Sequence, residues 1–498
     1  MRALVPLLLA TAPALADPAF EPVALPSEHL YSGGWEHFVG GGVAIFDCNG
    51  DARPELYVAG GTDPARLFVN RSTAGEITFA SAEIGPLTAV TGAYPLDLDG
   101  DGMQDLMVLR NGPNVLLRGL GDCRFEDATD RFGLPQDDRW TTAFSATWEA
   151  QGSLPTLAFG NYVDQTDPNG PFGTCDRNFL LRPEGDRYGA PVPLDPGYCA
   201  LSMLFSDWQR SGTPMLRVSN DRHYYIREGR EQMWLLDPLR ELTPDEGWPE
   251  QQLWGMGIAS RDITGDGRPE VMLTSMGDQI LMANTGDGFA AMPYETGATA
   301  HRPHTGDDGR ASTGWHAEFG DVDNDGRADL FIAKGNVDQM PDMAMQDPNN
   351  LLMQQSDGTF AEAASTAGVA SPHRSRGAGL ADLDGDGRLD LVVVNRRAPL
   401  EVWRNVTPGT GGWLTVALSQ PGANRDAVGA VVELRTDAGP QSQEVTVGGG
   451  HVSGQSGPLH FGLGAAAEAE LRVIWPDGTT EDWQPVQADQ KVRVDRDD

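Results

Sequence analysis

The chain has 498 residues, of which 40% are hydrophobic, so it can form a large domain and a smaller one. Its net charge of −36 disfavours binding to nucleic acid or to anionic membranes, because like charges repel. The 61 glycines and 35 prolines, with few stretches of helical period, favour an all-β chain of short strands and turns.

The first 16 residues are typical of a secretory signal peptide. Arg2 precedes the apolar run 3–10, and Ala14-Leu15-Ala16 before Asp17 resembles a cleavage site. The apolar run is too short to span a bilayer, and the sequence offers no other transmembrane candidate. We therefore expect a secreted or periplasmic protein.

The chain contains four cysteines, which allow three pairings: Cys48, Cys123, Cys175 and Cys199. An exported protein can form disulfides. Cys175 and Cys199 bracket one loop-like stretch, so we favour this pair, with Cys48–Cys123 as the second. Free buried thiols are the alternative. No pair has the C-x-x-C spacing of a zinc site.

An acidic stretch at 97–106 places carboxylates at positions i, i+2, i+4 and i+8, with glycines between them. Carboxylates this close repel one another, and such dense oxygen ligands suit calcium. The spacing occurs five times. The predicted metal ligands are Asp47, Asn49, Asp51 and Glu55; Asp97, Asp99, Asp101 and Asp105; Asp262, Thr264, Asp266 and Glu270; Asp321, Asp323, Asp325 and Asp329; and Asp382, Asp384, Asp386 and Asp390.

An EF-hand loop is the obvious alternative, but it needs a bidentate Glu at its twelfth position. That position is apolar in all five loops: Val58, Val108, Leu273, Ile332 and Val393. Each lies in a β-type run, so each loop should lead into a strand. Acidic turns without metal are the other alternative, because Asp and Gly are common in turns. Five copies favour about five structural calcium sites.

The loops belong to a longer repeat. Two further units, at 148–157 and 207–216, keep the glycine turn and the following apolar strand but lack the carboxylates. Repeats of about 40–60 residues with several short strands are typical of a β-propeller. We expect seven blades over residues 17–405. The stretch 20–24 resembles 360–364, the Phe-led strand that the seventh unit lacks, so the N-terminal strand should complete the last blade.

The pattern changes from about Val406. Alternating runs at 413–418, 430–434, 443–447, 471–475 and 491–494 predict a small β-sandwich or barrel over residues 406–498. The expected fold is therefore an all-β seven-bladed propeller followed by this C-terminal domain.

Both parts resemble known families. The repeats are similar to FG-GAP/VCBS repeats, the calcium-loop blades also found in integrin α-chain propellers. The tail resembles the ASPIC/UnbV domain at 424–430 (Asn-Arg-Asp-Ala-Val-Gly-Ala), at 448–450 (Gly-Gly-Gly), at 460–464 (His-Phe-Gly-Leu-Gly) and at 475–478 (Trp-Pro-Asp-Gly). The combination resembles the cartilage acidic protein family. It implies an exported calcium-binding propeller and no particular reaction. Thr264 departs from the ligand pattern, so we expect a weaker site there.

The sequence has no G-x-S-x-G elbow, no His-Glu-x-x-His and no P-loop. We therefore expect no enzyme, but a binding or adhesion module for an extracellular protein or glycan. The alternative is an extracellular glycan-active enzyme with its site at the propeller channel mouth, and a third interpretation is a maturation factor for another exported protein.

Two further groups of residues were considered as ligand sites. His301, His304 and His316, near Asp307 and Asp308, fit no firm metal template, and we interpret them as a polar loop. Five tryptophans are expected mainly in the core, with sugar stacking as the alternative: Trp208, Trp234, Trp248, Trp254 and Trp315.

Overall fold

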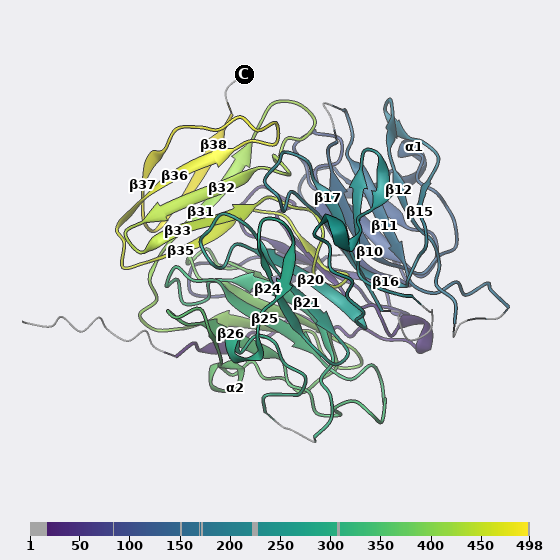
Figure 1. Cartoon of the computed structure of the whole chain (residues 1–498), viewed down its shortest axis with the longest axis horizontal. Helices are drawn as coiled ribbons and strands as arrows, with labels where there is room; N and C mark the ends of the chain where they lie inside the picture. The colour runs from purple at the N-terminus through teal and green to yellow at the C-terminus, as the bar shows by residue number, and fades with distance from the viewer. Residues whose placement is uncertain are drawn as a thin grey trace, which may run out of the picture.

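The computed structural model describes residues 17–82, 84–149, 152–168, 170, 173–221, 228–305 and 309–496. The predicted signal peptide, Asp307 and Asp308 lie outside the described residues. The described chain forms seven blades of four antiparallel strands each, followed by a C-terminal pair of sheets; one further strand, from the C-terminal part of the chain, joins the first blade in parallel. Figure 1 shows the strands within residues 412–444 and 459–495, green to yellow, grouped at one side of the other sheets. The predicted all-β propeller with a small C-terminal β-domain is confirmed.

Each of the first six blades uses four strands that follow one another along the chain. The first strands of neighbouring blades pack against one another, so these strands line the centre: β2 (Val43–Phe46), β6 (Val90–Leu96), β10 (Thr141–Thr147), β16 (Ala200–Ser206), β20 (Gly255–Arg261), β24 (Gly314–Gly320) and β28 (Ser375–Ala381). The second strands are β3 (Glu55–Val58), β7 (Asp105–Arg110), β11 (Thr156–Asn161), β17 (Met215–Asn220), β21 (Glu270–Ser275), β25 (Asp329–Lys334) and β29 (Asp390–Asn395).

The third strands are β4 (Arg66–Asn70), β8 (Val115–Gly119), β12 (Asn178–Leu181), β18 (Gln232–Leu236), β22 (Ile280–Asn284), β26 (Asn350–Gln354) and β30 (Glu401–Asn405). The outermost strands are β5 (Phe79–Ala82), β9 (Phe125–Asp127), β15 (Val192–Leu194), β19 (Leu239–Glu241), β23 (Phe289–Ala291), β27 (Phe360–Glu362) and, in the last blade, β1 (Phe20–Pro22). Helices are short, as in α1 (Thr129–Phe132) and α2 (Ala364–Ala367).

The N-terminal strand closes the ring, as the sequence predicts. β1 pairs antiparallel with β30, with Phe20 opposite Asn405 and Pro22 opposite Trp403. Phe20 is buried beside Trp403 and Leu391. The seventh blade is thus made of three strands from one end of the repeat region and one from the other, which removes an unpaired sheet edge.

The apolar runs of the repeats become strands that are buried on both faces. Strands such as β3, β11 and β29 have no exposed residue, because each blade is packed between two neighbours. Apolar clusters fill the gaps between adjacent blades, as between blades four and five around Trp208, Trp248 and Phe289. Trp208, Trp234, Trp248 and Trp315 are buried, in agreement with the expectation of core tryptophans.

The C-terminal domain packs two sheets face to face. One contains β31 (Gly412–Ser419), β35 (Leu459–Gly464) and β38 (Gln490–Asp495); the other contains β32 (Val431–Thr436), β33 (Gly439–Glu444), β36 (Glu468–Ile474) and β37 (Gln484–Gln487). Leu414, Val432, Phe461 and Leu471 lie in the core between them. The predicted strand at 443–447 is wrong at its C-terminal end. β33 stops at Glu444, because the chain then leaves this domain and enters the propeller.

The segment 447–455 of the C-terminal domain occupies the centre of the propeller. Val447 pairs with Ala146 of β10, Gly448 with Leu204 of β16, and Gly450 with Ile258 of β20. Its last two residues form β34 (Gly454–Gln455), parallel to β2. We refer to residues 447–455 as the plug segment. The sequence analysis did not predict that this segment enters the propeller.

Glycines of the innermost strands make room for the plug segment. A Cβ atom at Gly42 would lie 1.8 Å from the carbonyl oxygen of Val452, and one at Gly92 would lie 1.9 Å from the same atom. These contacts are far below van der Waals distance, so only glycine fits at these two positions. The plug segment therefore depends on the residues of the propeller wall as much as on its own sequence.

Candidate metal centres and the surrounding surface

Each acidic loop joins the first and second strands of a blade, and its first aspartate shapes the turn. In the loop that follows β6, Asp97 accepts hydrogen bonds from the backbone N–H groups of Asp101 (3.1 Å) and Gly102 (2.9 Å). The loop that follows β28 has the same arrangement, with Asp382 bound to Gly385 (2.7 Å) and Gly387 (3.1 Å). Asp47, Asp262 and Asp321 occupy the same role in their loops.

The last carboxylate of each loop, at the start of the second strand, bonds to the loop and to the third strand of the blade. Asp105, the first residue of β7, accepts the N–H of Leu98 in the loop (2.9 Å) and that of Gly119 at the end of β8 (2.8 Å). Asp390 makes the equivalent bonds to Leu383 (2.9 Å) and Asn405 (2.8 Å). Glu55, Glu270 and Asp329 repeat the pattern. These carboxylates have a structural task whether or not a metal is bound.

Three of the five loops gather carboxylate oxygens within 4.8 Å of one another. The groups are Asp97, Asp99 and Asp101; Asp321, Asp323 and Asp325; and Asp382, Asp384 and Asp390. In two of these groups a buried oxygen, Oδ1 of Asp99 or Oδ1 of Asp323, has no hydrogen-bond partner among the described residues. A buried anionic oxygen without a partner is costly, so a cation fits between these side chains.

Burial and repulsion act together on the acids of these loops. Burial, together with repulsion from Asp426, Asp101 and Asp99, raises the pKa of Asp97 to about 6. Burial likewise raises the pKa of Asp105 to about 8, with smaller contributions from Asp97 and Asp99. A bound cation favours the ionised forms and would remove this penalty. The donor set consists of hard oxygen atoms, which is the chemistry that calcium requires.

Arginines compensate part of the charge. Arg118 donates to Asp99 (2.7 Å) and to Asp101, and Arg404 donates to Asp384 (3.0 Å). Arg327 and Arg388 pair with the carboxylates of Asp325 and Asp386. Several of these paired carboxylates belong to the three close groups, so the arginines offset part of the repulsion within the groups themselves.

The loops that begin at Asp47 and Asp262 are less acidic. Among the described residues, neither loop gathers three carboxylates as closely as the other three do; the group around Glu55 includes Cys48 and Cys123, which are disulfide-bonded. Asn49 donates its side-chain N–H to Glu55 (3.0 Å). The predicted ligands of these two loops share the turn geometry of the others but not their density of charge.

The unit at 207–216 shows what a loop without the carboxylates looks like. Asp207 keeps the turn bonds, to the N–H groups of Ser211 (2.9 Å) and Gly212 (2.6 Å). Arg210 then pairs with Glu444 of the C-terminal domain (3.1 Å). The guanidinium of Arg210 thus supplies the positive charge at this loop, and the hydrogen bonds of Asp207 hold the turn without a metal ion.

The C-terminal domain lies against the acidic loops, which the sequence analysis missed. Ser442 donates to Asp262 (3.0 Å), His460 lies 2.7 Å from Asn324, and Gln104 donates to Asp426 (2.8 Å). A Cβ at Gly462 would lie 1.9 Å from Oδ2 of Asp321. Gly462, in the His-Phe-Gly-Leu-Gly motif, must therefore be glycine because it contacts the acidic loop that begins at Asp321. The motif is the only signal in the sequence for this contact.

The three histidines considered as a transition-metal site are not brought together. His301 pairs with Asp278 (2.7 Å), His304 lies 3.3 Å from Asn350, and His316 accepts the backbone N–H of His451 (3.0 Å) in the plug segment. Each has a local partner. The interpretation of all three as a polar loop is wrong for His316, which is buried in β24.

Both predicted disulfides are present. Cys175–Cys199 and Cys48–Cys123 are bonded, and no described cysteine is free. Disulfides are typical of oxidising compartments. Within the described residues, no helix has the length and apolar character needed to cross a membrane.

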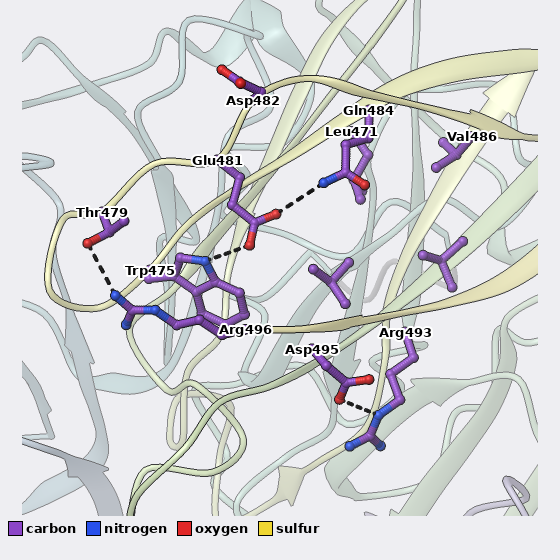
Figure 2. A pocket seen from close by; sticks show the side chains of 12 residues that line it. Leu471, Trp475, Thr479, Glu481, Asp482, Gln484, Val486, Arg493, Asp495 and Arg496 are labelled. Carbon is purple, nitrogen blue, oxygen red and sulfur yellow. Dashed lines mark hydrogen bonds and ion pairs between the residues drawn. The ribbon is translucent and has the colours of Figure 1, made fainter. Parts of the chain in front are cut away.

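A cavity of about 710 Å³ opens between β36, β37 and β38 of the C-terminal domain. Figure 2 shows that the polar side chains around it pair with one another: Trp475 and Gln484 with Glu481, Arg496 with Thr479, and Arg493 with Asp495. Leu471, Val486 and Val492 supply apolar lining. The cavity thus offers no converging set of unpaired polar groups.

Comparison with family models matches both parts of the chain. Residues 47–108, 262–332 and 336–393 match the FG-GAP-like repeat, and residues 420–498 match the ASPIC and UnbV domain. Among solved structures, the chain resembles BBS1N in its complex with ARL6DN (12% identity, 80% of this chain and 98% of that chain, TM-score 0.44) and the Dos1 propeller (9% identity, 76% and 95%, TM-score 0.38).

Three curated relatives are cartilage acidic protein 1 sequences. The mouse protein is 28% identical over 472 residues, which are 88% of this chain and 70% of that protein. The Xenopus tropicalis protein is 34% identical over 117 residues (22% and 18%), and the human protein 33% over 109 residues (21% and 16%). These two matches span less than a fifth of each relative.

Proposed function

We propose that this chain, whose FG-GAP-like repeats and ASPIC and UnbV domain make it a distant homologue of cartilage acidic protein 1, is an exported, calcium-stabilised binding module. We assign calcium as the ion that the five acidic loops bind. The observation that carries this proposal is that two of the carboxylate groups each keep a buried oxygen without a partner among the described residues, Oδ1 of Asp99 in one and Oδ1 of Asp323 in the other. Export is supported by the leader-like first 16 residues and by the two disulfides.

Binding, without catalysis, is supported by the filled centre of the propeller. The plug segment pairs with the innermost strands of five blades, and the C-terminal domain lies over the metal loops. The surface left for a large ligand is the opposite end of the propeller, where the second strands finish. We therefore favour an adhesion or binding role for an extracellular protein or glycan over a glycan-active enzyme at the channel mouth.

Metal titration tests the proposal directly. The purified protein is stripped with a chelator, dialysed and titrated with calcium or magnesium in a calorimeter, and bound metal is counted by elemental analysis. We expect saturable calcium binding that Asp99→Asn reduces and that Asp207→Asn, in the loop without the other carboxylates, leaves unchanged. Absence of bound calcium in the wild-type protein would refute the proposal. Incubation with extracellular glycans should yield binding without cleavage products.

A further inference from the structure

Four arginines surround a single aspartate at the end of the propeller opposite the C-terminal domain. Asp338 accepts hydrogen bonds from Arg396 (2.9 Å) and Arg397 (3.1 Å), and Arg374 lies 3.8 Å from it. Arg376 lies behind them and is bonded to backbone carbonyl oxygens, including that of Val337 (2.6 Å). A chain with a net charge of −36 thus concentrates four arginines at one place, with two acids beside them, Asp338 and Glu36, whose carboxylate lies next to Gly34.

The inner arginines of the cluster, Arg396 and Arg376, are buried. The Arg396 side chain is 1% exposed, and its Nε atom has no hydrogen-bond partner among the described residues. Burial, and then repulsion from Arg397, lowers the pKa of Arg396. Arg376 is fully buried and is also repelled by Arg396. Asp338 and Arg397 are exposed by 46% and 44%, so a ligand can reach the outer part of the cluster from solvent.

An aromatic surface adjoins the cluster and is fixed by it. Arg397 donates to the carbonyl of Gly33 (3.0 Å) and Arg396 to that of Gly34 (3.0 Å), immediately before Trp35. Trp35 is 40% exposed. Its ring centroid lies 5.2 Å from that of buried Trp140. The indole therefore packs against Trp140, and the two guanidinium groups bind the backbone immediately before it.

We propose that this cluster, with Trp35, binds an acidic polysaccharide. A carboxylate or sulfate group of the polymer pairs with Arg397 and Arg374, whose planar guanidinium groups suit both anions, and an adjacent sugar ring packs on Trp35. The inference rests on the proposed binding function and names its ligand class. A flexible saccharide chain can place one anionic group here and keep its other charges in solvent, whereas an acidic folded protein would bring a whole surface against a chain of charge −36.

The test uses the full-length protein with millimolar calcium at low ionic strength. The probes are a hyaluronan octasaccharide, which carries carboxylates, a dextran sulfate oligosaccharide, a neutral dextran of the same length and a poly-glutamate peptide. Affinity is measured by calorimetry. We expect one or both acidic saccharides to bind, and binding to weaken as salt is added, because the contact is electrostatic. The two saccharide arms tell carboxylate from sulfate recognition.

Variants locate the site. Arg397→Gln should weaken saccharide binding tenfold or more, and Trp35→Ala should weaken it for both acidic saccharides. Arg240→Gln is the matched control, because the Arg240 side chain is also 44% exposed and also pairs with one carboxylate, that of Glu246. Arg397→Lys keeps the charge and should retain part of the affinity. Unchanged melting temperatures exclude loss of folding as the cause.

Four results would overturn the inference. Equal binding of neutral dextran would exclude charge recognition, tighter binding of poly-glutamate would assign the site to an acidic protein segment, and equal effects of Arg397→Gln and Arg240→Gln would place binding elsewhere. If neither acidic saccharide binds, the inference fails. Calcium titration of the same protein then shows separately whether the calcium-binding module survives.

Discussion

At the residue scale, the carboxylates of one loop have different tasks. The first and last, such as Asp382 and Asp390, accept backbone N–H groups and hold the turn and three strands. The middle ones, such as Asp99 and Asp323, keep an oxygen without a partner. The four-residue spacing therefore combines a structural frame with a cation site, and substitutions at different positions in a loop should have different consequences.

Asp382→Ala should lower the free energy of unfolding more than Asp207→Ala when calcium is present. Asp382→Ala removes three backbone hydrogen bonds and Asp207→Ala removes two, at about 1 kcal/mol each. Only Asp382→Ala also removes a calcium site, which contributes about 2.7 kcal/mol at a hundredfold excess of calcium over Kd. Denaturant unfolding in millimolar calcium and in chelator measures both. Equal costs in calcium would contradict the assignment of a site to the Asp382 loop.

The graded charge of the loops predicts an order of filling. The loops at Asp97 and Asp382 have four aspartates, whereas Asn49 and Thr264 each replace one carboxylate in the loops at Asp47 and Asp262. Loss of one formal charge near a divalent ion weakens binding by about 1–2 kcal/mol. We expect calcium to leave the Asp47 and Asp262 loops first as its concentration falls. Crystals soaked at several calcium concentrations would reveal the occupancies, and first filling at Asp262 would contradict the expectation.

His451 of the plug segment makes stability depend on pH. Burial lowers its pKa from the usual 6.5 to about 3. Between these values the unfolded chain binds the proton and the folded chain does not, so this contribution is complete above pH 6.5 and is lost as pH falls. At pH 5 the loss is about 2 kcal/mol. His451→Gln should reduce the pH dependence of the free energy of unfolding between pH 7.5 and pH 5, measured by denaturant unfolding at each pH.

At the element scale, closure of the ring depends on the three residues of β1, Phe20–Pro22. β1 is held by its pairing with β30 and by the buried side chain of Phe20. Without it, the last blade would present the edge of β30 to solvent, with its backbone groups unpaired. The shortest strand of the last blade therefore has a large effect on the whole ring.

Phe20→Ala should destabilise the protein by about 3 kcal/mol, since it empties a buried aromatic position. Glu21→Ala, on the exposed side of the same strand, is the control and should change stability by less than about 0.5 kcal/mol. Thermal and denaturant unfolding compare the two. A similar small effect for both would show that the strand contributes through its backbone pairing alone.

At the scale of the whole molecule, the acidic loops, the C-terminal domain and the plug segment form one connected structure. The loops contact the C-terminal domain through Ser442, His460 and Asp426, and that domain sends the plug segment into the propeller. Repulsion among uncompensated carboxylates should therefore disturb both the domain contact and the plug.

A chelator should lower the melting temperature markedly and increase hydrogen exchange in residues 447–455. The physical reason is that ions bound only to the folded state stabilise it, and the loops that hold them support the C-terminal domain. Exchange measured by mass spectrometry, with and without calcium, checks this. Unchanged melting with unchanged exchange would show that the acidic loops fold without metal.

The sequence by itself determined the features that depend on local chemistry. The loop spacing, the apolar run after each loop and the spare strand around Phe20 predict seven blades, ring closure and the turn-forming aspartates, because each is encoded within a few consecutive residues. The path of 447–455, the contact of Gly462 with Asp321 and the meeting of Arg374, Arg396 and Arg397 around Asp338 were decided only by the tertiary structure. Each of these contacts joins residues of different blades or domains. The spacing of residues along the chain does not specify which of these segments lie next to one another in space.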